Sequence, residues 1–149
     1  MEEKRIGVEV RAVSNRIRRH MDSSGVKKDI DDLTGMHGYI IGFLAHQQES
    51  KKVFQRDIER AFSIRRSTAS VILQRMERNG LIVRESVPED ARLKCIVLTE
   101  KARALFCCIE GELAALEAKM QRGLSPAELT TFFTVMDRIK QNLDEGVAP

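Results

Sequence analysis

A chain of 149 residues in which 42% are hydrophobic can bury the core of one ordinary domain without disulfide bonds, so extensive disorder is excluded. No apolar run approaches the roughly 20 residues that cross a bilayer, and the amino terminus contains no hydrophobic leader, so we expect a soluble cytoplasmic protein without a membrane partner. The net charge is only +3, but it is unevenly distributed. Residues 56–94 hold nine Lys and Arg against six Asp and Glu, while the rest of the chain is balanced. The positive excess therefore lies in one segment, where it can attract phosphate groups.

Three helices are expected in the first part of the chain. Apolar residues recur every three or four positions over about residues 5–22, which predicts an amphipathic helix that ends at residues 23–25. Thr34 can cap a second helix with one continuous apolar face. A short third helix is expected at about residues 54–61.

A fourth helix and a β-hairpin follow. Ser63 is the candidate N-cap of a helix over residues 65–79, which Gly80 ends as a C-terminal stop. Short strands are then expected at residues 81–85 and 93–98, on either side of a long polar loop.

Two long helices complete the chain. The first runs for about 22 residues from Thr99, and the second begins at Ser125-Pro126, where Glu128 completes a capping box. Their apolar stripes are longer than a small globule can cover, so both helices need a partner surface.

We therefore expect one domain over residues 1–149. The fold class is mostly α with a small β-hairpin, the wing of a winged helix-turn-helix, with N- and C-terminal dimerisation helices. The winged lobe is expected at residues 34–98, and the dimerisation helices at residues 5–22 and 99–145.

The fourth helix has the side chains that a helix needs to read the major groove of DNA. With its apolar residues turned inward, the other side presents long hydrogen-bond donors and short hydroxyl groups. Arginine can pair with guanine, glutamine with adenine, and valine can contact a thymine methyl group. An ordinary amphipathic surface helix would explain the same pattern. The candidate DNA-binding residues are Arg65, Arg66, Ser67, Thr68, Ser70, Val71, Gln74, Arg75 and, from the hairpin, Arg92.

The hairpin strengthens this interpretation. An arginine at its tip, Arg92, can enter the minor groove, and Asp90 can hold the guanidinium in position. A surface ion pair with little energetic effect is the alternative for these two residues.

Three segments resemble the MarR (multiple antibiotic resistance regulator) family of transcription factors. They are Ser67-Thr-Ala-Ser-Val71, Met76-Glu-Arg-Asn-Gly-Leu-Ile-Val-Arg84, and Asp90-Ala-Arg92 followed after five residues by Leu98-Thr99. The resemblance extends over about residues 5–145. It implies a homodimer joined by its first and last helices, with two winged lobes on palindromic double-stranded DNA, and a role as a repressor.

The resemblance also implies a small aromatic or anionic effector that binds between the winged lobe and the dimer helices. Ordinary core packing is the alternative for the apolar residues in this set. The expected lining is Arg16, Met36, His37, Tyr39 and Phe43.

Other chemistries have weaker support. We expect no cofactor and no metal, because the three histidines and three cysteines lack ligand spacing. Cys95, Cys107 and Cys108 are expected to be small buried hydrophobic residues rather than oxidant sensors. No nucleophile with its base, paired carboxylates or glycine-rich phosphate loop indicates an enzyme. The remaining alternatives are a winged-helix module that binds proteins and a nonspecific nucleic-acid binder.

Overall fold

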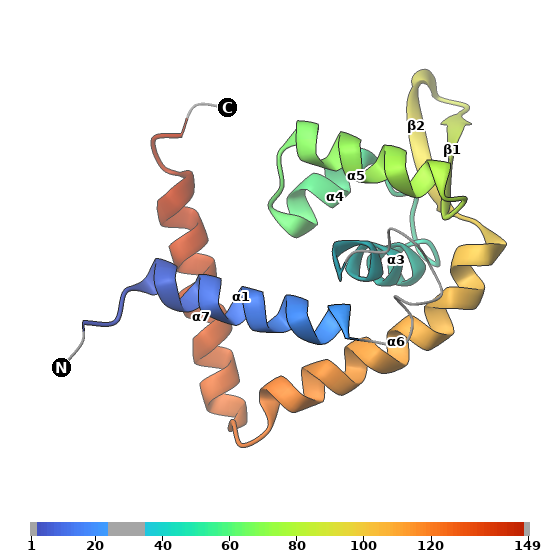
Figure 1. Cartoon of the computed structure of the whole chain (residues 1–149). Coiled ribbons are helices and arrows are strands. Elements are labelled where there is room, and N and C mark those ends of the chain that lie inside the picture. The colour runs from blue at the N-terminus through green and yellow to red at the C-terminus, as the bar shows by residue number, and fades with distance from the viewer. Residues whose placement is uncertain (1–2, 24–34, 148–149) are drawn as a thin grey trace. The chain divides into compact units, whose positions relative to one another are not determined.

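The computed structural model describes residues 3–23 and 35–147. Residues 24–25, expected to end the first helix, and Thr34, the expected cap of the second, lie outside the described residues. The elements in chain order are α1 (Ile6–Asp22), α3 (Gly35–Gln47), α4 (Gln55–Phe62), α5 (Arg66–Arg78), β1 (Ile82–Val87), β2 (Asp90–Leu98), α6 (Glu100–Gln121) and α7 (Pro126–Asp144) (Figure 1). This order confirms a mostly α fold with one β-hairpin.

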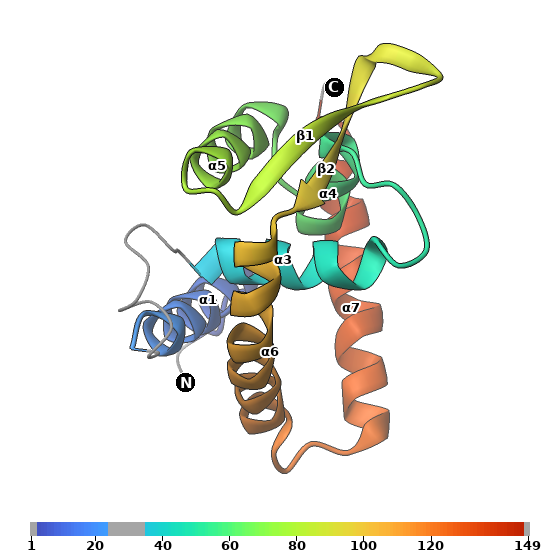
Figure 2. The same ribbon diagram turned by 90° about the vertical axis from the view of Figure 1, so that its right-hand side faces the viewer.

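The chain divides into two compact units, residues 1–114 and 115–149. The first contains the lobe, which we define as α3 to β2. Figures 1 and 2 both show α3 between α5 and α6, and α3 is apolar on all sides because it is enclosed there. The lobe core, with its contributions from α6, consists of Ile40, Ile41, Leu44, Val53, Ile58, Leu73, Met76, Leu81, Ile82, Ile96, Leu98, Ala102 and Ile109.

The end of α5 is fixed by Gly80, as expected. Gly80 has φ 71°, and its N–H donates to the carbonyl of Glu77 at 3.1 Å, while the N–H of Leu81 donates to the carbonyl of Met76 at 2.9 Å. These two bonds form a Schellman motif, and Leu81 and Met76 are both fully buried against the core. The turn therefore sets the direction in which β1 leaves α5.

The start of α5 differs from the prediction. Ser63 does not cap α5, because it is the left-handed C-cap of α4, with φ 51°, and its N–H donates to the carbonyl of Arg60. Arg65 is the residue that precedes the first turn of α5, and its side chain makes no capping bond. Because the turn between α4 and α5 is short, Ser63 ends α4 and cannot also cap α5, which begins at Arg66.

The hairpin strands are longer than expected. β1 pairs with β2 in antiparallel register from Ile82↔Leu98 to Ser86↔Lys94, and a bulge then lets Val87 pair with Asp90. The long loop expected between the strands is therefore wrong. Val87 is buried, and its pairing with Asp90 extends the hairpin to the residues next to the turn.

The hairpin is joined to α6 by Thr99, which precedes its first turn. The Thr99 hydroxyl donates to the carbonyl of Gly80 at 2.6 Å and accepts the N–H of Ala102 at 3.2 Å. The Thr99 N–H donates to the carbonyl of Leu81 at 3.1 Å. One residue thus connects the end of α5, the start of β1 and the N-terminus of α6.

Gln48, just after α3, supports the hairpin from the other side. Its Nε2 donates to the carbonyl of Ile96 at 2.7 Å, and its Oε1 accepts a bond of 3.4 Å from Arg103 of α6. The N–H of Ile96 donates to the carbonyl of Val53 at 2.8 Å. The backbone N–H and the carbonyl of Ile96 are therefore both hydrogen-bonded to the loop between α3 and α4.

The second unit contains the end of α6 and all of α7. Ser125 begins α7 with the predicted capping box: its hydroxyl accepts the N–H of Glu128 at 3.2 Å, and its own N–H donates to the Glu128 carboxylate at 2.7 Å. None of the residues of α7 is buried, and Phe132 and Phe133 are each more than half exposed.

Candidate nucleic-acid interface

The accessible part of α5 carries most of the side chains expected to read DNA. Ala69, Leu73 and Met76 are fully buried and turn one side of the helix into the core. Val71 is 59% exposed although it is apolar. The expected residues that the structure leaves exposed on this helix and its N-cap are Arg65, Arg66, Ser67, Thr68, Val71, Gln74 and Arg75.

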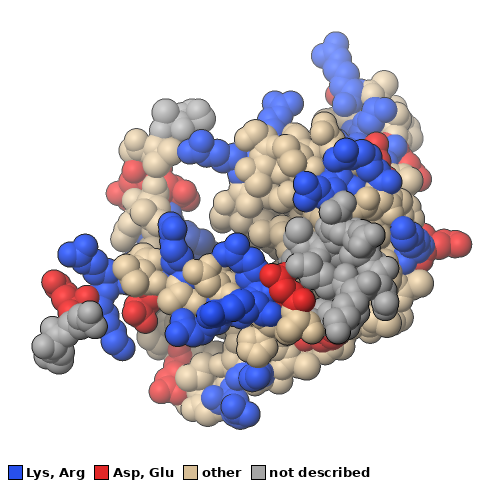
Figure 3. All heavy atoms as spheres, in the orientation of Figure 1, with Lys and Arg blue, Asp and Glu red and all other residues tan. Residues whose placement is uncertain are grey.

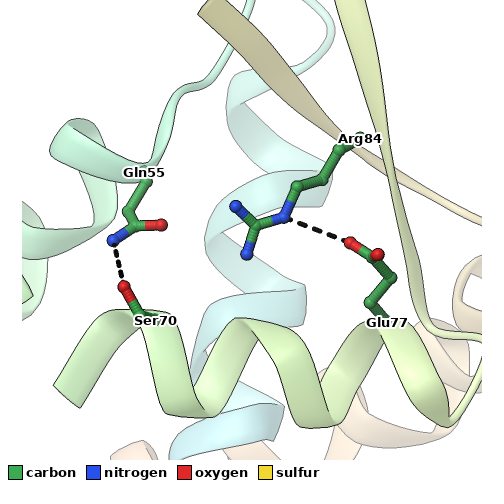
Figure 4. Close-up of polar contacts among 4 residues, drawn as sticks. All are labelled: Gln55, Ser70, Glu77 and Arg84. Atoms are coloured by element: carbon green, nitrogen blue, oxygen red, sulfur yellow. Dashed lines mark hydrogen bonds and ion pairs between the residues drawn. The ribbon is translucent and has the colours of Figure 1, made fainter. Parts of the chain in front are cut away.

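Ser70 differs from the rest of this set because its hydroxyl is engaged within the protein. It is half-buried and accepts a 3.0 Å hydrogen bond from Nε2 of Gln55, the first residue of α4 (Figure 4). The same nitrogen donates to the carbonyl of Arg66 at 3.3 Å. The Gln55 side chain therefore ties α4 to the first turns of α5.

The hairpin places Arg92 in solvent near its outer end. The Asp90 carboxylate accepts the main-chain N–H of Arg92 at 2.9 Å, which is the bond of an Asx turn. We expected the carboxylate to hold the guanidinium, but the bond goes to the main chain, because an Asp side chain reaches the N–H two residues ahead without ordering a long side chain. Asp90 thus shapes the backbone that carries Arg92.

A groove of about 650 Å³ lies between α4, α5 and the hairpin. Arg66 and Arg92, both expected from the sequence, line it, and the structure therefore brings the helix and hairpin arginines to one surface feature. The other basic side chains on its walls are Arg56, Arg84 and Lys94, with Glu59 as an acidic neighbour. Figure 3 shows lysine and arginine side chains over this α5 and hairpin end of the lobe.

Arg84 was missed at the sequence level. It pairs with buried Ile96 across the hairpin and lies two residues after buried Ile82, so it is on the strand face that meets the lobe core. Its Nε donates to Oε2 of Glu77 on α5 at 3.1 Å (Figure 4). The alternation of inward and outward residues along β1 could have indicated Arg84, because it places this arginine at an inward position where an apolar residue is expected.

Comparison with known proteins gives this geometry a family. The sequence profile of the MarR family matches residues 31–93. The transcription regulator MarR from Oenococcus oeni PSU-1 is 34% identical, the match covers 92% of this chain and 99% of that one, and the TM-score is 0.81. The chain belongs to the MarR family. Its fold is that of a MarR-family transcriptional regulator.

Two further similar structures contain DNA. MepR of S. aureus in a DNA complex is 25% identical, with 95% of this chain and 100% of that chain covered and a TM-score of 0.79. A protein from Listeria monocytogenes complexed with 26mer DNA is 21% identical, with 95% and 90% coverage and a TM-score of 0.76, and shows the shared fold.

The residues expected to line an effector site in this MarR-family chain lie in different surroundings within the described part of the chain. Phe43 packs edge-to-face on Phe62, with ring centroids 5.7 Å apart, and so faces α4. His37 is buried, and Met36 packs against the core, while Tyr39 is half-buried. Arg16 is exposed and lines a hollow on α1. The effector site remains a prediction.

Helices α1, α3 and α6 do meet at Gly38. A Cβ atom built on this glycine would lie 3.4 Å from Cε of Met21 and 3.5 Å from Cγ2 of Ile109. The three helices approach closely at Gly38, and a Cβ atom there would make ordinary van der Waals contacts.

The cysteines fit the sequence prediction in part. Cys95 is buried, but Cys107 and Cys108 are exposed, so the expectation of buried residues is wrong for these two. Both lie off the side of α6 that carries buried Ala102 and Ile109.

Within residues 3–23 and 35–147, no group of three His, Cys, Asp or Glu could hold a metal ion. In the same described part of the chain, no helix is long and apolar enough to cross a membrane.

Proposed function

We propose that this MarR-family protein is a homodimeric, sequence-specific DNA-binding regulator, and that it acts as a repressor released by a small aromatic or anionic effector. The observation that carries the proposal is the accessible row of donors on α5 beside Arg92 of the hairpin. A helix with such side chains reads base edges in the major groove, and an arginine on a hairpin reaches the minor groove. The DNA bound to MepR supports DNA as the ligand.

A second copy of the chain is the proposed partner of α1 and α7. Neither helix buries a residue within one chain, although both carry large apolar side chains, such as Ile6 and Val8 on α1 and Phe132 and Phe133 on α7. Faces of this kind are usually covered by another protein surface. A two-fold dimer would present two lobes to an inverted repeat with half-sites about 34 Å, or one helical turn, apart.

Selection from a pool of random DNA duplexes at near-physiological salt tests the proposal. We expect enrichment of an inverted repeat with half-sites one turn apart, because each lobe reads one half-site. Binding without enrichment would favour the nonspecific nucleic-acid binder. Absence of duplex binding would favour the protein-interaction module and would overturn the proposal.

Arg92 provides the sharpest test at the level of a residue. We expect Arg92→Ala to weaken operator binding by about 1–3 kcal/mol, because the variant removes the proposed minor-groove contact. Fluorescence anisotropy with the selected duplex measures this change.

Arg122→Ala is the matched control for Arg92→Ala. Arg122 is an exposed arginine in the second unit, outside the lobe. Arg103 is less suitable as a control, because it donates to Gln48, which supports the hairpin. Equal losses for Arg92→Ala and Arg122→Ala would indicate general charge attraction rather than a contact by the hairpin.

A further inference from the structure

We propose that Arg84 and Glu77 form a phosphate-binding element for the DNA backbone, in the groove between α4, α5 and the hairpin. Arg84 contacts a phosphate, and Glu77 is a positioning residue that holds the guanidinium in place. This inference rests on the proposed function, and it adds to it two residues outside the base-reading set. The partner is a backbone phosphate of the same duplex that α5 reads.

The groove has the charge that a phosphate requires. Its walls include five basic side chains from α4, α5 and both strands of the hairpin, and Glu59 is its acidic neighbour. Cations gathered around a concave surface raise the local concentration of anions more than the same charges spread over a flat one. The basic lining residues are Arg56, Arg66, Arg84, Arg92 and Lys94.

Among the ion pairs of the described residues, Arg84 is the groove residue that has a partner, Glu77, which orients its guanidinium. Its side chain is 27% exposed, and its Nε donates to Glu77 Oε2 at 3.1 Å. Figure 4 shows the two terminal nitrogens directed away from Glu77, toward the side where Gln55 and Ser70 lie. A guanidinium has five N–H groups, so the bond to Glu77 leaves those of the terminal nitrogens to form the paired donors that suit phosphate oxygens.

Two residues link the groove to the proposed DNA-reading surface. Arg66 belongs both to the exposed part of α5 and to the groove wall, and Arg92 belongs both to the hairpin and to the wall. A duplex that contacts Arg66 and Arg92 together must pass over the groove between them. The phosphate of that duplex is therefore the anion that the groove meets.

The role of Glu77 can be tested by whether Glu77→Ala strengthens or weakens DNA binding. Glu77 is a negative charge beside a DNA-binding surface, so simple charge repulsion predicts that Glu77→Ala tightens DNA binding. If Glu77 positions Arg84, the same substitution weakens binding, because the freed arginine must be ordered again each time DNA binds.

Equilibrium binding to the selected operator and to a random duplex, each as a function of salt, measures both residues. We expect Arg84→Met to weaken binding to both duplexes by about 10-fold and to reduce the salt slope by about 0.9, the value for one phosphate contact. We expect Glu77→Ala to weaken binding by about 3-fold or more, and Glu77→Gln, which keeps an acceptor oxygen, to restore part of the loss. In the Arg84→Met background, Glu77→Ala should instead tighten binding.

Glu85→Ala is the control, because Glu85 is an exposed acidic residue on β1 that does not line the groove. It should leave binding unchanged or slightly tighter. An unchanged salt slope in Arg84→Met, or tighter binding of Glu77→Ala in the otherwise wild-type protein, would overturn the inference while the proposed function stands. Loss of duplex binding by the wild-type protein itself would overturn both.

Discussion

Ser63 and Gly80 both have left-handed backbone conformations, with φ 51° and 71°, and each ends a helix of the lobe. Glycine reaches this region without the steric cost that a Cβ atom imposes on other residues. The two residues thereby set the directions in which the chain leaves α4 and α5. The orientation of the proposed recognition helix depends on these two short turns as much as on its own sequence.

We expect Gly80→Ala to lower the free energy of unfolding by about 1 kcal/mol, because alanine resists a positive φ. Space is not the reason, since the nearest atom to a Cβ at Gly80 is Cδ of Lys101 at 4.0 Å. Urea denaturation measures the change.

Gly111→Ala is the matched control, because Gly111 lies inside α6 with nothing within 4 Å of its added Cβ. It should raise the free energy of unfolding by about 0.5–1 kcal/mol. Destabilisation of similar size in both variants would contradict the backbone argument.

Some residues of the proposed interface could be predicted from a local sequence pattern, and others could not, because their roles depend on contacts with other groups. The exposed donors on α5 were predicted because a helical period alone separates buried Leu73 and Met76 from their neighbours. Arg84 was not, because its role depends on a contact with Glu77, which lies on another element. The bond from Asp90 to a main-chain N–H was also missed, since charge alone suggested an ion pair.

At the level of elements, the helices could be predicted closely because their periodicity and end signals are local. The bounds of α1, α5 and α7 lie within a residue or two of expectation, and the capping box at Ser125 is present. The hairpin loop could not be predicted in the same way. Its register includes a bulge after Ser86, which lets buried Val87 pair with Asp90, and a simple alternation of apolar and polar residues does not predict such a bulge.

We expect Gln48→Ala to destabilise the lobe by about 1–2 kcal/mol, because the carbonyl of Ile96 would lose a partly buried donor. Hydrogen exchange should show the loss in β2 more than in α4. Glu49→Ala is the control, since Glu49 is the exposed neighbour of Gln48. Equal stability of the two variants would show that Gln48 does not support the hairpin.

We also expect Ser125→Ala to lower stability by about 1 kcal/mol, because it removes the oxygen that accepts the Glu128 N–H. Thermal unfolding measures this loss. Ser14→Ala, an exposed serine inside α1, is the control and should not lower stability, because alanine is the better helix former. An unchanged midpoint for Ser125→Ala would show that the start of α7 is held by other contacts.

For the whole molecule, the important feature is how little of α1 and α7 is buried in one chain. If these helices are covered in a homodimer, unfolding is coupled to dissociation. The thermal midpoint should then rise by about 2 °C for each tenfold increase in protein concentration. Phe132→Glu, at an exposed position of α7, should remove this dependence by placing a charge in the interface. A wild-type midpoint that is independent of concentration would contradict the homodimer.

Thr99 gives the molecule a mechanical property. Because its bonds to Gly80 and Leu81 fasten the first turn of α6 to the end of α5, those two helices meet at a fixed joint. From that joint the part of α6 that belongs to the first unit, residues 100–114, extends for about 22 Å. Because the joint is fixed, a rotation of the end of α5 by about 5° moves residue 114 by about 2 Å. A small rotation of the lobe and a shift of residue 114 on α6 are thus two measures of one motion.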